Sequence, residues 1–110
     1  MTLSDELKLI AKKELLSKLK VIETNKLDLV EDVRRILSLA EKAGISDDDL
    51  FLPIKGIESQ TDHIPVGDVR KQFNESYLKE LDKEQEELTI EFKDQLIDAS
   101  KKILNKLENE

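Results

Sequence analysis

The segment from Asn74 to Leu107 reads NESYLKELDKEQEELTIEFKDQLIDASKKILNKL and contains neither glycine nor proline. Apolar side chains recur along it every three or four residues, the spacing that places them on one face of an α-helix. The inward face comprises Leu81, Leu88, Phe92, Leu96, Ala99 and Ile103. Asn74 is a favourable N-cap, and lysines near the end complement the negative pole of the helix dipole. The segment predicts one long helix within residues 74–110, continuous from about Glu75 to Leu107.

Residues 1–44 contain two shorter helical patterns joined near residues 23–25, which predicts an antiparallel helical hairpin. Ser4 is the expected N-cap of the first helix, and Gly44 the left-handed cap that ends the second. We expect the neighbouring Arg34 and Arg35 to lie on the solvated face. The two buried stripes are Leu3, Leu7, Ile10, Ala11, Leu15, Leu19 and Ile22, and then Leu27, Val30, Val33, Ile36, Leu37 and Ala40.

Every glycine, every proline and the single histidine fall between Gly44 and Gly67. Residues 45–73 are therefore predicted to be an irregular Gly/Pro-containing insert. Residues 46–49 begin a short helix or turn, which we expect Pro53 to end because a proline ring removes a backbone donor. The apolar Ile54, Ile57, Ile64 and Val66 either form one or two short extended segments or anchor a loop. Asp68 is expected to cap a short helical turn that continues to Phe73.

The predicted fold is all-α: one domain with a helical hairpin, an irregular insert and one long C-terminal helix. At ~1.5 Å per residue, the long helix spans about 50 Å and each hairpin helix roughly 25 to 30 Å. The hairpin alone cannot cover the apolar face of the long helix. Either the insert folds back over the remainder, or a second subunit covers it in a homodimer, or the long helix breaks.

The chain of 110 residues has a net charge of −7 and no cysteine. Residues 46–68 hold six acidic side chains against one lysine. This concentration of acid repels nucleic acid and favours a basic protein partner. The sequence starts with acids where a signal peptide carries basic residues, and no apolar run approaches the ~20 residues of a bilayer span. We therefore predict a soluble, cytoplasmic protein with neither a nucleic-acid nor a membrane partner.

Catalytic residue types meet only in the run from Ser59 to His63, where Thr61 and Asp62 lie between them. A histidine side chain can serve as a general base, and a hydroxyl near it could serve as a nucleophile. Short polar residues of this kind also build turns by bonding their own backbone. Three interpretations stay open: a turn, a contact with a partner, and catalysis by His63. Turn building and partner contact are favoured, and no catalytic residue or enzyme activity is predicted.

A metal site is not predicted either. The acids at positions 47, 48, 49, 58 and 62 lack the alternating pattern with a central glycine that a calcium loop requires. One histidine without a second is also a weak basis for zinc. No cofactor is expected, because the three glycines are too dispersed for a phosphate-binding loop.

The runs 27–37, 49–57 and 59–70 resemble an uncharacterised family of small bacterial helical proteins. Its central segment typically reads Ser-Glu-Thr-Asp-His-Leu-Pro, and this chain has SQTDHIP at residues 59–65. The resemblance covers about residues 27–105. This chain departs from it at Gln60, where the family has an acid, and at Phe73, where a bulkier aromatic is expected. It implies a small helical fold and a bacterial, cytoplasmic setting, and carries no activity.

The function we predict is a non-enzymatic protein-binding module, most concretely an immunity-type protein that neutralises a basic toxin through its acidic insert. The alternative is a structural or regulatory homo-oligomer assembled through the long C-terminal helix. The predicted partner-binding residues are Asp47, Asp48, Asp49, Glu58, Ser59, Thr61, Asp62, His63 and Arg70.

Overall fold

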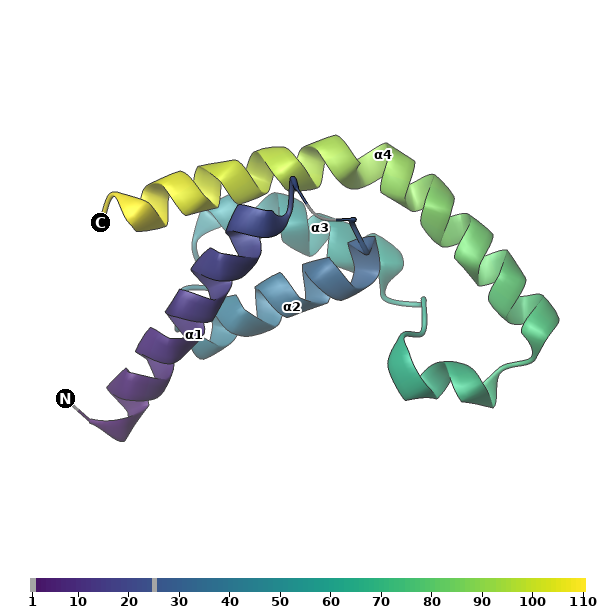
Figure 1. Ribbon diagram of the computed structural model, residues 1–110, viewed down its shortest axis with the longest axis horizontal. Coiled ribbons are helices and arrows are strands. Elements are labelled where there is room, and N and C mark those ends of the chain that lie inside the picture. The colour runs from purple at the N-terminus through teal and green to yellow at the C-terminus, as the bar shows by residue number, and fades with distance from the viewer. Residues whose placement is uncertain (1, 25) are drawn as a thin grey trace.

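The longest element of the computed structural model, which describes residues 2–24 and 26–110, is helix α4, Glu75–Glu108. The Asn74 side chain begins it by accepting the Tyr77 N–H at 2.8 Å. The helix is unbroken and accounts for the 51 Å length of the molecule. It bends gently, with its concave side toward the other helices (Figure 1), as long helices that wrap a core do. The predicted long helix is confirmed.

Helices α1, Leu3–Val21, and α2, Leu29–Lys42, form the predicted hairpin. Lys18 Nζ lies 2.5 Å from the Asp32 carboxylate, which ties the two helices together where Asp32 is only 9% exposed. Gly44 has a φ of +76°, which confirms the predicted left-handed cap. The N-cap of α1 is Thr2, where Ser4 was predicted.

The first turns of α1 are exposed, so the prediction that they join the core is wrong. Leu3, Leu7 and Ile10 are 72%, 57% and 53% exposed. The cause is the length of the partner helix. The chain leaves α2 after Lys42 and its Gly44 lies against Lys8, so the start of α1 extends past the end of α2.

The insert is more helical than predicted. It consists of the 3₁₀ turn η1, Asp49–Phe51, the helix α3, Leu52–Thr61, and the 3₁₀ segment η2, Gly67–Gln72. The expectation that Pro53 ends a helix is wrong: it lies in the first turn of α3, where no backbone donor is needed. Ile54 and Ile57 are buried on this helix and form no extended segment. The helical turn after residue 66 is confirmed, but Val66 precedes it and Asp68 does not cap it.

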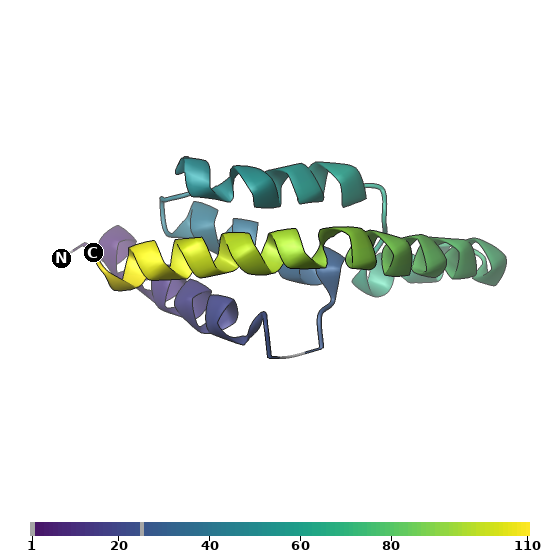
Figure 2. The same cartoon turned by 90° about the horizontal axis from the view of Figure 1, so that it is seen from above.

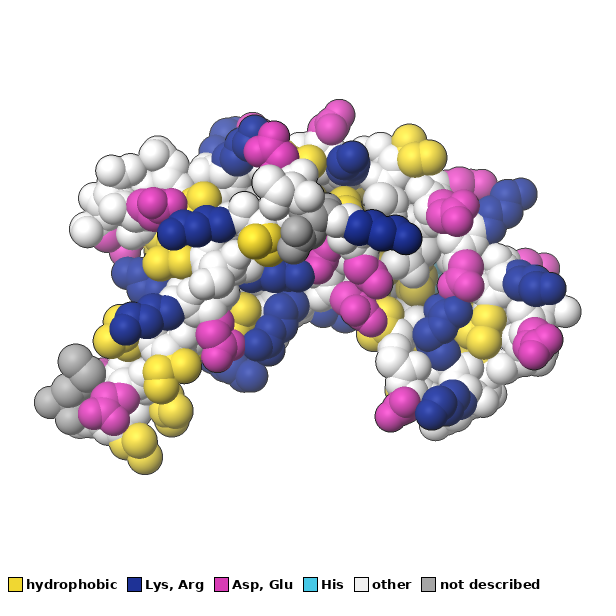
Figure 3. Space-filling view, viewed as in Figure 1, with side chains coloured by type: hydrophobic (Ala, Val, Ile, Leu, Met, Phe, Trp, Pro, Cys, Tyr) yellow, Lys and Arg dark blue, Asp and Glu magenta, His cyan; other side chains and the backbone are white. Residues whose placement is uncertain are grey.

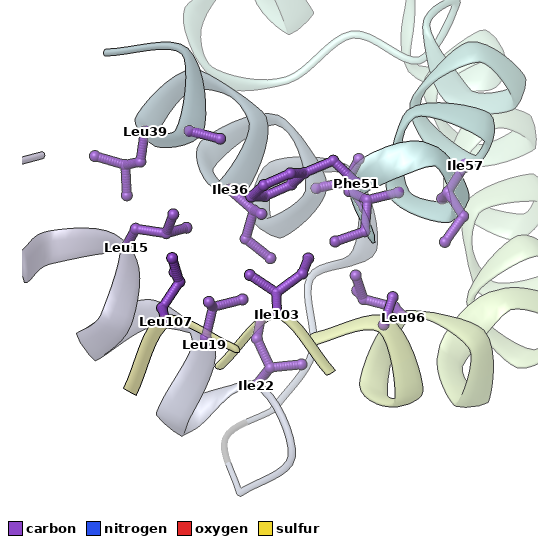
Figure 4. Packing of buried hydrophobic residues seen from close by; sticks show 14 of the residues in the cluster. Leu15, Leu19, Ile22, Ile36, Leu39, Phe51, Ile57, Leu96, Ile103 and Leu107 are labelled. Atoms are coloured by element: carbon purple, nitrogen blue, oxygen red, sulfur yellow. The ribbon is translucent and has the colours of Figure 1, made fainter. Parts of the chain in front are cut away.

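Helix α4 lies across the other three helices, with α3 along one side, α1 along the other and α2 beneath (Figure 2). The insert therefore folds back against α4, which was one of the three alternatives for covering its apolar face. Phe51, at 1% exposure, projects into the centre of the core, between Ile36 and Ile57 (Figure 4). The main hydrophobic cluster draws on α1, α2, η1, α3 and the C-terminal half of α4.

None of the helices in the described part of the chain combines the length and apolar composition that a membrane crossing requires. The expected fold class, all-α with a hairpin and a long C-terminal helix, is confirmed.

Candidate partner-binding site

The end of α3 is fixed by hydrogen bonds that turn the chain toward η2. The Thr61 hydroxyl donates to the Ile57 carbonyl oxygen at 3.0 Å, within the helix. Thr61 is fully buried, so it cannot touch a partner, and its prediction as a surface contact is wrong. Its side chain instead bonds to the backbone of α3 at the last residue of that helix.

Arg34 of α2 forms hydrogen bonds to the backbone of the same turn. Its Nη2 donates to the carbonyl oxygens of Thr61 at 3.1 Å and Ile64 at 2.9 Å. Arg34 was expected on the solvated face, but it is only half-exposed because its guanidinium reaches across to α3. The expectation holds for Arg35, which is exposed and pairs with Glu14 at 2.9 Å.

Two further contacts attach the segment after α3 to the N-terminal half of α4. His63 Nε2 lies 2.7 Å from Glu84 Oε1, with both side chains nearly half exposed. The Arg70 guanidinium lies 2.9 Å from the Asp82 carboxylate. The partner of His63 is thus a residue of α4, and not the adjacent Asp62. These pairs hold η2 beneath the start of α4 (Figure 1).

The surface between α2, α3 and η2 is a groove of about 540 Å³. Its lining comprises Arg34, Glu58, Asp62, His63, Ile64, Pro65, Val66, Val69 and Phe73. Among the described residues, neither Glu58 nor Asp62 has an ion-pair partner for its side chain. Val69 and Phe73 are 50% and 39% exposed. The groove therefore presents free carboxylates beside apolar side chains.

The three successive aspartates lie at the other end of α3, where η1 begins. Asp47 and Asp49 are exposed. Asp48 accepts the Leu50 N–H at 2.9 Å and pairs with Lys106 of α4. The hydrogen bond from the Lys106 ammonium, followed by the bond from the Leu50 backbone, lowers the pKa of Asp48 below its ordinary value. Asp48 thus anchors η1 to α4.

The predicted site is therefore divided. Glu58, Asp62 and His63 share the groove, whereas the aspartates before α3 lie apart from it. Ser59 is exposed on α3, and Arg70 is half-buried against Asp82. Within residues 2–24 and 26–110, no three histidine, aspartate or glutamate side chains are grouped so as to hold a metal ion.

The other residues that line the groove were not among the predicted site residues: Arg34, Ile64, Pro65, Val66, Val69 and Phe73. Arg34 follows the buried Val33 and lies four residues after the buried Val30, so it borders the buried face of α2. That position is the one sequence signal that points to a half-buried role. Ile64, Pro65 and Val66 follow α3 directly, whereas Val69 and Phe73 reach the groove after the turn at Gly67, where φ is +67°.

Comparison of the chain with protein-family models, with curated proteins and with solved structures gave no match. The groove and its chemistry are therefore the basis for a functional proposal.

Proposed function

We propose that the chain is a non-enzymatic protein-binding module, and that the groove between α2, α3 and η2 receives a basic and apolar segment of a partner protein. The observation that carries the proposal is the pair of free carboxylates, Glu58 and Asp62, beside the exposed Val69 and Phe73. A lysine or arginine of the partner would meet the carboxylates, while an adjacent aliphatic or aromatic side chain would cover the apolar residues.

The side-chain contacts that border the groove favour such a role. The Arg34 guanidinium is committed to backbone carbonyls of the turn, so it shapes the groove more than it offers a free positive charge. His63 is oriented by Glu84, and η2 is held by the Arg70–Asp82 pair. A surface already held in one conformation loses less entropy on binding.

The finer assignment is an immunity-type protein that neutralises a basic toxin. It rests on the net charge of −7 and on the acids of the insert. Complementary charge accelerates association with a basic partner. The exposed Asp47 and Asp49 would add to this long-range attraction from outside the groove. A partner of this class should associate more slowly as the salt concentration rises, because exposed charges are screened within about 8 Å at physiological ionic strength.

The experiment that tests the groove is peptide selection on the folded chain. Peptides selected on the wild type should combine a lysine or arginine with a neighbouring large apolar residue. They should lose affinity for the double variant Glu58→Gln/Asp62→Asn and keep it for Glu87→Gln/Glu91→Gln. The control pair removes the same charge from exposed positions of α4. Equal loss in both variants would show a general charge effect and reject the groove.

His63→Gln adds a second measurement in the same assay. An exposed ion pair contributes only ~0.2–1 kcal/mol to folding, so the melting temperature should change little. Affinity for the selected peptides should fall, because His63 lines the groove. Unchanged affinity in a folded variant would remove His63 from the site.

The alternative function, a homo-oligomer assembled through α4, has one observation in its favour. Ile90 projects from α4 with 83% of its surface exposed. If α4 is the assembly element, Ile90→Glu should lower the mass of the oligomer in solution. The same variant serves as a control in the experiment described next.

A further inference from the structure

The first half of α1 carries an apolar stripe that has no cover among the described residues. Leu3, Leu7 and Ile10 are more than half exposed. Their spacing of four and then three residues places them in one line along the helix. Figure 3 shows hydrophobic side chains gathered on this arm, which projects from the body at the lower left. From Ala11 onward the same helix enters the core.

The stripe is flanked by one acidic and one basic side chain, which can pair with the same two side chains of a second, antiparallel copy of the helix. Glu6 and Lys13 lie seven residues apart and flank the same side of the stripe. Neither takes part in an ion pair within the part of the chain that the structure describes. The other flank holds Ser4, whose small exposed side chain allows a second helix to approach, whereas Ala11 is buried in the subunit's own core.

Two copies of this arm would fit together in antiparallel orientation. Leu7 would then face Ile10 of the partner subunit, and Glu6 would face Lys13 of the partner subunit. Twofold symmetry makes each of these contacts twice, since the same patch serves both subunits. A parallel arrangement would bring this flank against the Ser4 flank of the partner subunit, where Glu6 would meet no basic side chain. The position of Glu6 and Lys13 on one flank therefore selects the antiparallel pairing.

We infer that the chain forms a homodimer through the first half of α1, with Leu7 and Ile10 of the two subunits packed antiparallel. The arm extends past the end of α2, so a second copy reaches it without displacing the hairpin (Figure 1). The interface is small, and a small interface gives a weak, concentration-dependent dimer. The groove lies at the end of α3 and stays accessible in each subunit.

Sedimentation of the full chain from about 1 μM to about 1 mM tests the inference. The mass should rise from monomer to dimer with concentration. Leu7→Glu should raise the dissociation constant at least about tenfold, because it places a charge in the apolar interface. Helical circular dichroism should be unchanged, since Leu7 is exposed in the monomer. Ile90→Glu is the matched control and should dimerise like the wild type.

Charge reversal tests the orientation independently of folding. Glu6→Lys alone and Lys13→Glu alone should each weaken the dimer about fivefold, because both symmetric pairs become repulsive. The double variant restores the pairs and should restore the dimer. A monomer at every concentration would assign the stripe to another occupant and overturn the inference. If Ile90→Glu abolished the dimer and Leu7→Glu did not, the interface would lie on α4 and the inference would be overturned. If the double variant did not dimerise again, the antiparallel register would be overturned.

Discussion

Arg34 Nη2 lies 2.9 Å from the carbonyl oxygen of Ile64, so a side chain of α2 holds the backbone that leaves α3. Ile64 is itself 1% exposed, which places this charge-assisted hydrogen bond at the edge of a buried turn. The bond joins two segments thirty residues apart in sequence. The bond holds together two residues that line the groove, and it is the basis of the first prediction.

Arg34→Met should cost about 1.5–3 kcal/mol of unfolding free energy, because hydrogen bonds from a charged donor are worth that much and the carbonyls lose their partner. Methionine keeps the apolar stem of the side chain. Hydrogen exchange of the backbone amides of residues 62–64 and 66 should accelerate. Arg35→Met is the control and should cost less than ~1 kcal/mol, since Arg35 forms an exposed ion pair with Glu14. Equal costs would mean that Arg34 does not support the turn.

The second prediction concerns Phe51, at the centre of the core. Phe51→Ala should lower the free energy of unfolding by about 3–5 kcal/mol, as the loss of a buried ring does. Phe73→Ala removes the same atoms from a ring that is 39% exposed and whose centroid lies 5.5 Å from that of the tilted Tyr77 ring. That change should cost only about 1 kcal/mol. Urea denaturation of both variants measures the contrast, and similar values would contradict the burial of Phe51.

The sequence predicted the elements whose signals are local. The long helix follows from the Asn74 cap and from 34 residues without glycine or proline. Gly44 is likewise a local signal, because glycine favours the left-handed conformation that ends α2. The short helical turn expected from residues 46–49 is η1, because Asp48 is a residue type that caps helices and accepts the Leu50 N–H there. Pro53 was misleading because the same ring that ends one helix is favourable in the first turn of another.

The groove depended on contacts that the sequence does not encode locally. Glu58, Asp62 and His63 were identified because their residue types suit binding. Arg34 and Glu84 were not, since each acts on a residue more than twenty positions away. The exposure of Leu3 and Leu7 could not be predicted from the helical periodicity either, because it depends on where the opposite helix ends. Periodicity shows which face is apolar but not what covers it.

The third prediction follows from the ion pair between Asp48 and Lys106. Their contact lowers the pKa of Asp48 below 3.8 and raises the pKa of Lys106 above 10.5. A lowered carboxyl pKa stabilises the fold at pH values above the pKa of the unfolded state. That contribution is lost as pH falls through the pKa of the folded state. A raised lysine pKa stabilises the fold at pH values below the pKa of the unfolded state. That contribution is lost as pH rises through the pKa of the folded state.

Asp48→Asn tests this directly, because asparagine still caps η1 while the charge is removed. Its melting temperature should lie below that of the wild type between the two ordinary pKa values of 3.8 and 10.5. The difference should vanish in stronger acid and in stronger base. Asp47→Asn at the exposed neighbouring position should follow the wild type throughout. A constant difference at every pH would exclude the ion pair as its cause.

The last prediction concerns Ser100 of α4, whose side chain is buried with 1% exposure. Its hydroxyl oxygen has no hydrogen-bond partner among the described residues. A buried polar group without a partner costs ~1–3 kcal/mol, and alanine also has the higher helix propensity. Ser100→Ala should therefore raise the free energy of unfolding by about 1 kcal/mol or more. The control Ser17→Ala, at an exposed position of α1, should gain only the propensity difference of about 0.5 kcal/mol. Chemical denaturation of the two variants measures the difference, and destabilisation by Ser100→Ala would contradict the absence of a partner for the hydroxyl.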